Sequence, residues 1–226
     1  MGVAGENPVG TLMLGSKTDK KNIELGRLLY QVREDIDVHR IIGLNVVAIR
    51  DSQISSALVG YLQKTAQESL ALYFCKIFEL PDGHSLNSIP GIIGSLPETP
   101  LSGDQATAFI AFGRKYGNKM HPSQGKSYLN KTFNQFRKKH SVSLKLLKTF
   151  RDTVGAHSGS DSNSKFLPSH HECEKLYTFA FEFYNLVARY VINSGPATIP
   201  RLAGSGLVSL MKSMGVQKPK TDFDVV

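Results

Sequence analysis

The chain has 226 residues, of which 41% are hydrophobic and 20% charged, and its formal net charge at pH 7 is +8. This composition is typical of a globular protein and excludes a disordered or fibrous one, and the length suffices for one sizeable core. No apolar run approaches the roughly 20 residues of a membrane-spanning helix, and no secretory signal is recognisable. We therefore expect a soluble, cytoplasmic protein without membrane partners, in which Cys75 and Cys173 are free thiols within helices.

Amphipathic helices account for the first half of the chain. Residues 22–42 and residues 52–80 both place apolar side chains at intervals of three and four, which predicts two long helices. Asp51 or Ser52 is the expected N-cap of the second helix. The connection over 81–103 is rich in Gly, Pro and Ser and longer than compact domains usually contain. It indicates either a functional excursion or a flexible insert.

Further helices follow in the second half. We expect one helix over 104–116 and a long one from about 127 to 154. Ser169 and Glu172 have the spacing of a capping box, which predicts the start of a fifth helix. Beyond residue 193 the sequence predicts at most one short helix, over about 206–213.

These elements predict an all-α fold, an antiparallel bundle of four to five long helices. Residues 1–20 are expected to form a flexible N-terminal segment and residues 21–195 the helical domain, with the long connection at 81–103. Residues 196–226 are then a C-terminal extension.

Positive charge is concentrated in one part of the chain. Residues 105–151 contain eleven Lys or Arg and no Asp or Glu. The remainder of the chain contains the other 16 of the 27 basic residues and all 19 acidic residues, so its net charge is −3. Such asymmetry predicts a polyanionic partner, most simply a nucleic acid, although a solvated basic helix face is the plain alternative.

The end of the helix over 127–154 carries an unusual arginine. Arg151 falls on the same stripe as Leu147 and Val154, at intervals of four and three residues. An unpaired charge on an apolar stripe is costly, so either a carboxylate meets Arg151 or the stripe opens onto an interface or cleft that holds an anion. Gly155 can end the helix and turn the chain, which would bring His157 beside Arg151.

The stretch RDTVGAHS, from Arg151 to Ser158, resembles the signature of the HEPN superfamily (higher eukaryotes and prokaryotes nucleotide-binding). That signature is an Arg, a polar neighbour and then a His; here Asp152 is the neighbour and five residues separate Arg151 from His157. The ending AHS is similar to the abortive-infection branch. The resemblance covers about residues 20–195 and implies a HEPN-like bundle that forms a homodimer, with two Arg/His pairs facing each other across the two-fold axis.

Active members of the superfamily are metal-independent endoribonucleases, so the resemblance implies RNA cleavage at a composite dimer site with no cofactor and no metal. A ribose 2′-hydroxyl attacks the adjacent phosphate. His157 is suited to transfer protons near neutral pH, and Arg151 to stabilise the charge on phosphorus. Asp152 would orient either group. The residues expected to contact RNA are Arg137, Lys138, Lys139, Lys145, Lys148 and Ser158. A role as a toxin in phage defence, restrained by an antitoxin-like inhibitor, is also implied.

Other functions stay open at this stage. A HEPN-like domain without cleavage activity would serve as an RNA-binding or dimerisation module. A helical adaptor would bind a partner protein through 81–103 or 196–226. A metal site would use His170, His171 and Cys173 together with His157 or Cys75. Adjacent histidines cannot easily point at one ion, which disfavours this last alternative.

The aromatic residues of the basic stretch are expected to be structural. Phe133 and Phe136 have the helical spacing of core residues rather than that of a base-stacking surface. His140 is expected to be a partly exposed neighbour of the basic run Arg137-Lys138-Lys139.

Overall fold

The computed structural model describes residues 17–52, 54–82, 86–98, 100–101, 103–120, 124–156, 167–195, 202–216 and 219–221, without the side chains of 154–156 and 202–203. Its helices are α1 (Lys17–Leu44), α2 (Val46–Arg50), α3 (Ser56–Phe78), α4 (Ile89–Ser95), α5 (Gly103–Lys115), α6 (Gly125–Lys139), α7 (Ser141–Ala156), α8 (His170–Val187), the π-helix η2 (Ala188–Ile192) and α9 (Leu202–Ser213). An isolated β-bridge between Pro100 and Gln124 is the one extended pairing among these residues. The expected all-α class is confirmed.

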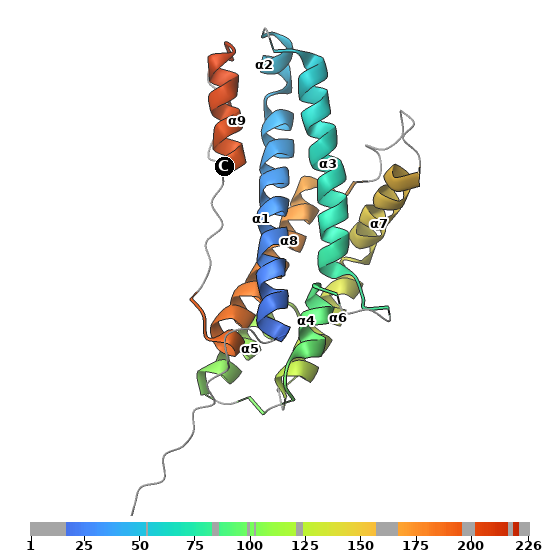
Figure 1. The fold of residues 1–226 in the computed structure, drawn as a ribbon, viewed down its shortest axis with the longest axis vertical. Helices are drawn as coiled ribbons and strands as arrows, with labels where there is room; N and C mark the ends of the chain where they lie inside the picture. Colours follow the sequence, from blue (N-terminus) through green and yellow to red (C-terminus); the bar gives the residue numbers. More distant parts are fainter. Residues whose placement is uncertain are drawn as a thin grey trace, which may run out of the picture.

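Two long helices, α1 and α3, lie side by side along the longest axis of the molecule, and α8 crosses behind them (Figure 1). Helix α7 packs on α3, and α9 packs on α1, while α4, α5 and α6 close the end of the bundle opposite α2. None of the described helices combines the length and the hydropathy needed to cross a membrane.

An aromatic cluster forms the centre of the core. The rings of Phe136 and Phe179 stack with their centroids 3.8 Å apart, and the ring of Phe78 lies 6.0–6.2 Å from those of Phe133, Phe136 and Phe179. Both Phe133 and Phe136 are buried, with 1% and 3% of their surface exposed. The expectation that these two residues belong to the core is therefore confirmed. Their burial fixes the orientation of α6, which in turn fixes where its basic side chains lie.

The expectation of one helix over 127–154 is wrong, because the helix is broken at His140 into α6 and α7. His140 is 7% exposed rather than partly exposed, and its Nδ1 lies 3.0 Å from Oε2 of Glu172 on α8. The hydroxyl of Ser143 donates to the same carboxylate oxygen at 3.1 Å. Neither Gly nor Pro stands at the break, so these contacts with α8 hold a bend that the local sequence does not indicate.

The expected connection over 81–103 contains a packed helix. Ile89, Ile92 and Ile93 of α4 are buried, and the hydroxyl of Ser88 caps the helix by accepting from the backbone N–H of Gly91. A Cβ at Gly91 would lie 2.1 Å from the carbonyl oxygen of Leu86, so only glycine fits there. Helix α4 therefore packs into the core, and this part of the connection is not a flexible insert.

Several helix boundaries also differ from the expected ones. Helix α1 begins at Lys17, so residues 17–20 of the expected flexible segment are helical. Helix α3 begins at Ser56, because Ser55 and not Asp51 or Ser52 is the N-cap, with its hydroxyl accepting from the N–H of Leu58.

The C-terminal helix α9 starts four residues earlier than expected and packs against the C-terminal half of α1 (Figure 1). Met211 and Val216 join Ile41, Ile42 and Ile49 in a second, smaller apolar cluster. Residues 202–216 thus pack on the bundle and contribute to its hydrophobic interior.

Candidate nucleic-acid interface

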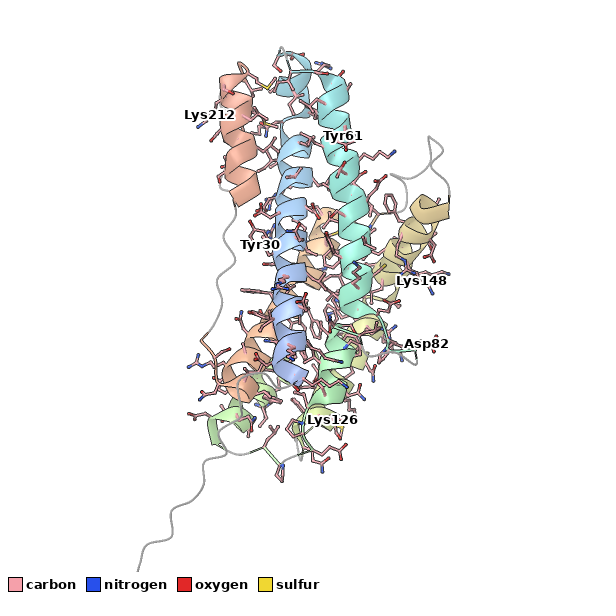
Figure 2. The ribbon with its side chains drawn as sticks, viewed as in Figure 1. Tyr30, Tyr61, Asp82, Lys126, Lys148 and Lys212 are labelled. Atoms are coloured by element: carbon pink, nitrogen blue, oxygen red, sulfur yellow. The ribbon has the colours of Figure 1, made fainter. Side chains whose placement is uncertain are left out.

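A cleft of about 510 Å³ lies where the C-terminal end of α3 meets α6 and α7. Its lining comprises Cys75, Phe78, Glu79, Leu80, Pro81, Asp82, Arg137, Leu144, Leu147, Lys148 and Arg151. Three of these residues, Arg137, Lys148 and Arg151, were expected at the functional site from the sequence. Lys148 projects outward from α7 on the same side of the molecule as Asp82, which follows α3 (Figure 2).

The position of Arg151 follows from the packing of α7. Leu147 and Phe150 are buried against α3, and Leu144 packs at the edge of the same core. Arg151 lies one turn beyond Leu147, at the place where the apolar stripe leaves the core and reaches the cleft. The side chain is 30% exposed, which is intermediate between a core residue and a surface arginine.

Carboxylates accompany this guanidinium. Nε and Nη2 of Arg151 donate to Oδ1 of Asp152 at 2.9 and 2.8 Å, and Nη1 lies 3.8 Å from Oε1 of Glu79. The hydrogen bonds that Arg151 donates to Asp152 raise the pKa of Arg151, which therefore stays charged. From the sequence, either a carboxylate would pair with Arg151 or its side chain would lie at a cleft. In the structure Arg151 both pairs with carboxylates and lines a cleft. Asp152 orients the guanidinium directly.

Arg137 enters the cleft from the last turn of α6. Its Cζ lies 5.8 Å from the centre of the Phe133 ring. Its Nε is buried and has no hydrogen-bond partner among the described residues. Because this Nε is closed off from solvent, a ligand in the cleft can contact Arg137 only through the terminal nitrogens of its guanidinium. Lys148 also lines the cleft. It is exposed and forms no ion pair with any side chain that the structure describes.

The cleft is not purely cationic. Glu79 and Asp82 line it, and the carbonyl end of α3 points toward it with the negative end of the helix dipole. Burial raises the pKa of the Cys75 thiol to about 11, so this thiol is protonated and unreactive at neutral pH. Sequence reasoning missed Glu79 and Asp82, because they lie some 70 positions from Arg151 and no local pattern marks them, and it considered Cys75 only as a ligand of the metal alternative.

The other expected RNA contacts are dispersed. Lys139 lies at a second hollow, between α5, α6 and α8, while the exposed Lys138 and Lys145 line neither this hollow nor the cleft. His157 and Ser158, the remaining expected site residues, lie outside the described residues. The structure therefore brings together Arg137, Lys148, Arg151 and the adjacent Asp152.

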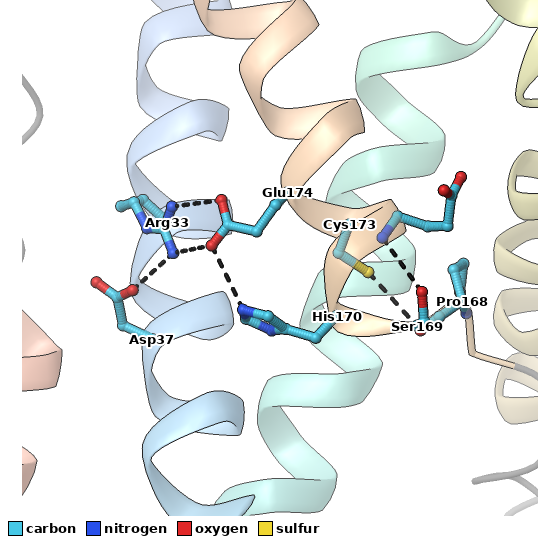
Figure 3. A network of polar contacts seen from close by, with 8 residues as sticks. Arg33, Asp37, Pro168, Ser169, His170, Cys173 and Glu174 are labelled. Atoms are coloured by element: carbon cyan, nitrogen blue, oxygen red, sulfur yellow. Dashed lines mark hydrogen bonds and ion pairs between the residues drawn. The ribbon is translucent and has the colours of Figure 1, made fainter. Parts of the chain in front are cut away.

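The residues of the metal alternative point in different directions. His170 faces α1, with Nε2 3.5 Å from Oε1 of Glu174, as Figure 3 shows. His171 lines the second hollow, and Cys173 is buried with its thiol near the carbonyl oxygen of Pro168. In the part of the chain that the structure describes, no three potential ligands are grouped so as to hold a metal ion.

Comparisons with known proteins add no relative. No family model matches the chain, and neither a curated protein nor a solved structure shows significant similarity to it.

Proposed function

We propose that this protein is a metal-independent endoribonuclease of the HEPN type, with the cleft between α3, α6 and α7 as the place where RNA phosphates bind. The observation that carries the proposal is the convergence of Arg137, Lys148 and Arg151 on one cleft. These residues come from two helices of a stretch that holds the positive charge excess of the chain. The RDTVGAHS resemblance supplies the reaction class.

The proposed reaction is a transesterification within RNA. The 2′-oxygen attacks the adjacent phosphorus, the bond to the 5′-oxygen breaks, and the products are a 2′,3′-cyclic phosphate and a 5′-hydroxyl. His157 transfers a proton from the attacking 2′-hydroxyl or to the leaving 5′-oxygen. Arg151 binds phosphoryl oxygens and stabilises the added negative charge on the five-coordinate phosphorus. Asp152 holds the guanidinium in position.

The wider biological role rests on the resemblance alone. We propose a toxin of the abortive-infection, phage-defence type, active as a homodimer in which two copies of Arg151 and His157 form one composite site. An antitoxin-like inhibitor is the partner that such an activity requires in a living cell.

The decisive experiment compares the wild-type protein with His157→Ala on single-stranded RNA in the presence of EDTA. We expect the wild type to leave 2′,3′-cyclic phosphate ends, and His157→Ala to cleave about 100-fold or more slowly, the usual contribution of a general acid or base. Light scattering checks that the variant keeps the oligomeric state. His171→Ala, which removes an exposed histidine elsewhere, is the control. Absence of cleavage by the wild type, or unchanged cleavage by His157→Ala, would disprove the enzymatic proposal.

A second candidate function is an RNA-binding module without cleavage activity. One observation favours it: Nε and Nη2 of Arg151 both donate to Oδ1 of Asp152, which leaves fewer donors of this guanidinium for the extra charge of a transition state. This candidate predicts RNA binding that Arg137→Gln and Lys148→Gln weaken, with no cyclic phosphate formed by the wild type. The product analysis described above distinguishes the two functions.

A further inference from the structure

The solvent side of α3 carries a regular stripe of side chains. Leu58, Tyr61, Thr65, Glu68 and Leu72 follow one another at intervals of three, four, three and four residues, so they share one face of the helix. Among the described residues they are only partly covered: Tyr61, which Figure 2 labels, is 66% exposed, and Leu58 and Leu72 are 45% and 40% exposed. This alternation of three and four is the spacing of the seam along which two helices pack in a coiled coil.

The core does not account for this stripe. Helix α3 already has a buried face, to which Ala66, Leu70 and Phe74 belong, and its neighbours α1 and α7 lie on either side of it (Figure 1). A single exposed leucine is ordinary on a protein surface. Three large apolar side chains at coiled-coil spacing, on the side of the helix opposite the core, form a second apolar face instead, and such a face marks a contact with another helix.

The stripe and the charges beside it complement a second copy of themselves. Leu58 and Leu72 each lie seven residues from Thr65, so a two-fold axis beside Thr65 brings Leu58 against the partner's Leu72. The side chains of Lys64 and Glu68 are 66% and 34% exposed, with Nζ and Oε1 3.8 Å apart within one copy. The same axis sets Lys64 about 3 Å along the helix from the partner's Glu68, which is within reach of an ion pair.

We propose that a second copy of this chain docks on this stripe, with the two α3 helices antiparallel and crossing at Thr65. Leu58 and the partner's Leu72 close both ends of the contact, and Tyr61 lies beside the partner's Glu68. A parallel pair would set Glu68 against the partner's Glu68, and like charges that face each other are unfavourable. The contact itself carries one positive and one negative charge per copy, so the copies meet without local repulsion although each has a net charge of +8.

This contact is separate from the composite site of the proposed ribonuclease. Glu79, beside Arg151, lies fourteen residues after Thr65, or about 21 Å along the helix. An antiparallel pair centred on Thr65 therefore holds the two clefts about 40 Å apart and does not bring two copies of Arg151 together. None of the five residues of the stripe lines the cleft, so the proposal does not depend on the ribonuclease function. A chain that uses both contacts forms assemblies larger than a dimer.

The expected affinity is modest. A standard protein–protein interface buries about 800 Å² on each partner, and one pair of short helices buries less. We therefore expect a dissociation constant on the order of 10 µM. Association should become tighter as salt screens the repulsion between the two positively charged copies.

The test is sedimentation velocity of the full chain from about 1 to 200 µM, a range that spans the expected dissociation constant. We expect the mass of the wild type to double over this range. Tyr61→Glu places a carboxylate against the partner's Glu68 and should weaken association about tenfold or more. Val142→Glu is the matched control, because Val142 is 72% exposed on α7, and it should associate as the wild type does. Circular dichroism checks that both variants keep their helical content.

A cysteine at the axis tests the geometry. In Thr65→Cys the two new thiols meet beside the two-fold axis and should form an intermolecular disulfide under mild oxidation. Thr107→Cys, at an exposed position of α5, should stay unlinked. The native thiols of Cys75 and Cys173 are the same in both variants and do not affect the comparison.

Three outcomes would each overturn the proposal. They are a wild type that does not associate at the highest concentration, association of Tyr61→Glu as tight as that of the wild type, and equal cross-linking of the two cysteine variants. None of them bears on RNA cleavage, which the His157→Ala comparison tests separately.

Discussion

Two arginines in this protein each meet two carboxylates, yet their surroundings differ. Arg33, on α1, is 5% exposed; it contacts both carboxylate oxygens of Glu174 on α8, at 2.8 and 3.0 Å, and Oδ1 of Asp37 at 2.6 Å (Figure 3). Its guanidinium also lies 5.0 Å from the ring centre of Tyr177. Arg151 is 30% exposed and depends on its sequence neighbour Asp152 and on a more distant Glu79.

The comparison separates a structural arginine from one that is available to a ligand. The partners of Arg33 hold α1 and α8 together, and they satisfy a charge that has little access to water. The partners of Arg151 lie at the rim of a cleft and leave part of the guanidinium facing it. An incoming phosphate therefore competes only with partly hydrated contacts at Arg151, whereas at Arg33 it would have to open the core.

The largest expected effect is on stability when Arg33 is removed. Arg33→Ala leaves Glu174 and Asp37 without this cation at a buried site, so we expect the free energy of unfolding to fall by about 3–5 kcal/mol. Urea denaturation followed by circular dichroism measures this change. The control is Arg27→Ala, on the same helix but 72% exposed, for which a loss of less than about 0.5 kcal/mol is expected. A loss below about 1 kcal/mol for Arg33→Ala would show that Arg33 is not a structural arginine.

The pH dependence of stability examines the same network. Burial raises the pKa of Glu174, but the contacts with His170 and Arg33 outweigh burial and lower this pKa to about 2, from an ordinary value of 4.5. The contribution of Glu174 is thus fully present above pH 4.5 and is lost as the pH falls toward 2, by about 3 kcal/mol. Glu174→Gln should flatten the stability profile in this window. An unchanged slope in the variant would assign the acid sensitivity to other carboxyls.

Unlike the removal of Arg33, the removal of Arg151 should affect RNA binding more than stability. Since its contacts are partly solvated, we expect Arg151→Ala to change the free energy of unfolding by less than about 1 kcal/mol. RNA affinity, measured by fluorescence anisotropy with the single-stranded RNA of the cleavage assay, should fall about tenfold. Lys64→Ala on the outer face of α3 serves as the control for a lost surface charge. A large loss of stability with unchanged RNA affinity would make Arg151 a second structural arginine.

The smallest effect is expected at Glu79. Replacing this carboxylate by Gln removes a competitor of phosphate for Arg151, so RNA affinity should rise about two- to threefold at low salt and much less at high salt. Glu98→Gln makes the same change of charge near the start of α6, where Glu98 contacts Lys126 at 3.3 Å. If both variants gain equally, the effect is one of net charge and does not belong to the cleft.

Local sequence patterns predicted most of the long helices but neither the break between α6 and α7 nor the short helix α4. The stripe that includes Leu25, Leu29 and Ile36 correctly predicted α1, because residues at intervals of three and four lie on one face of a helix. The break at His140 was missed, since it depends on Glu172, 32 positions away. Helix α4 was missed because its seven residues are too few to show a period.

The sequence alone determined the all-α class, the basic stretch over 105–151 and the place of Arg151 on an apolar stripe, because each follows from composition or from helical period. Only the tertiary structure decided which basic residues meet. The bend at His140 and the packing of α7 on α3 bring Arg137 to the same cleft as Lys148 and Arg151, and they direct Lys139 to another surface. The physical reason is that side chains buried from distant helices set the direction of α6 and α7, and no window of sequence contains both partners of such a contact.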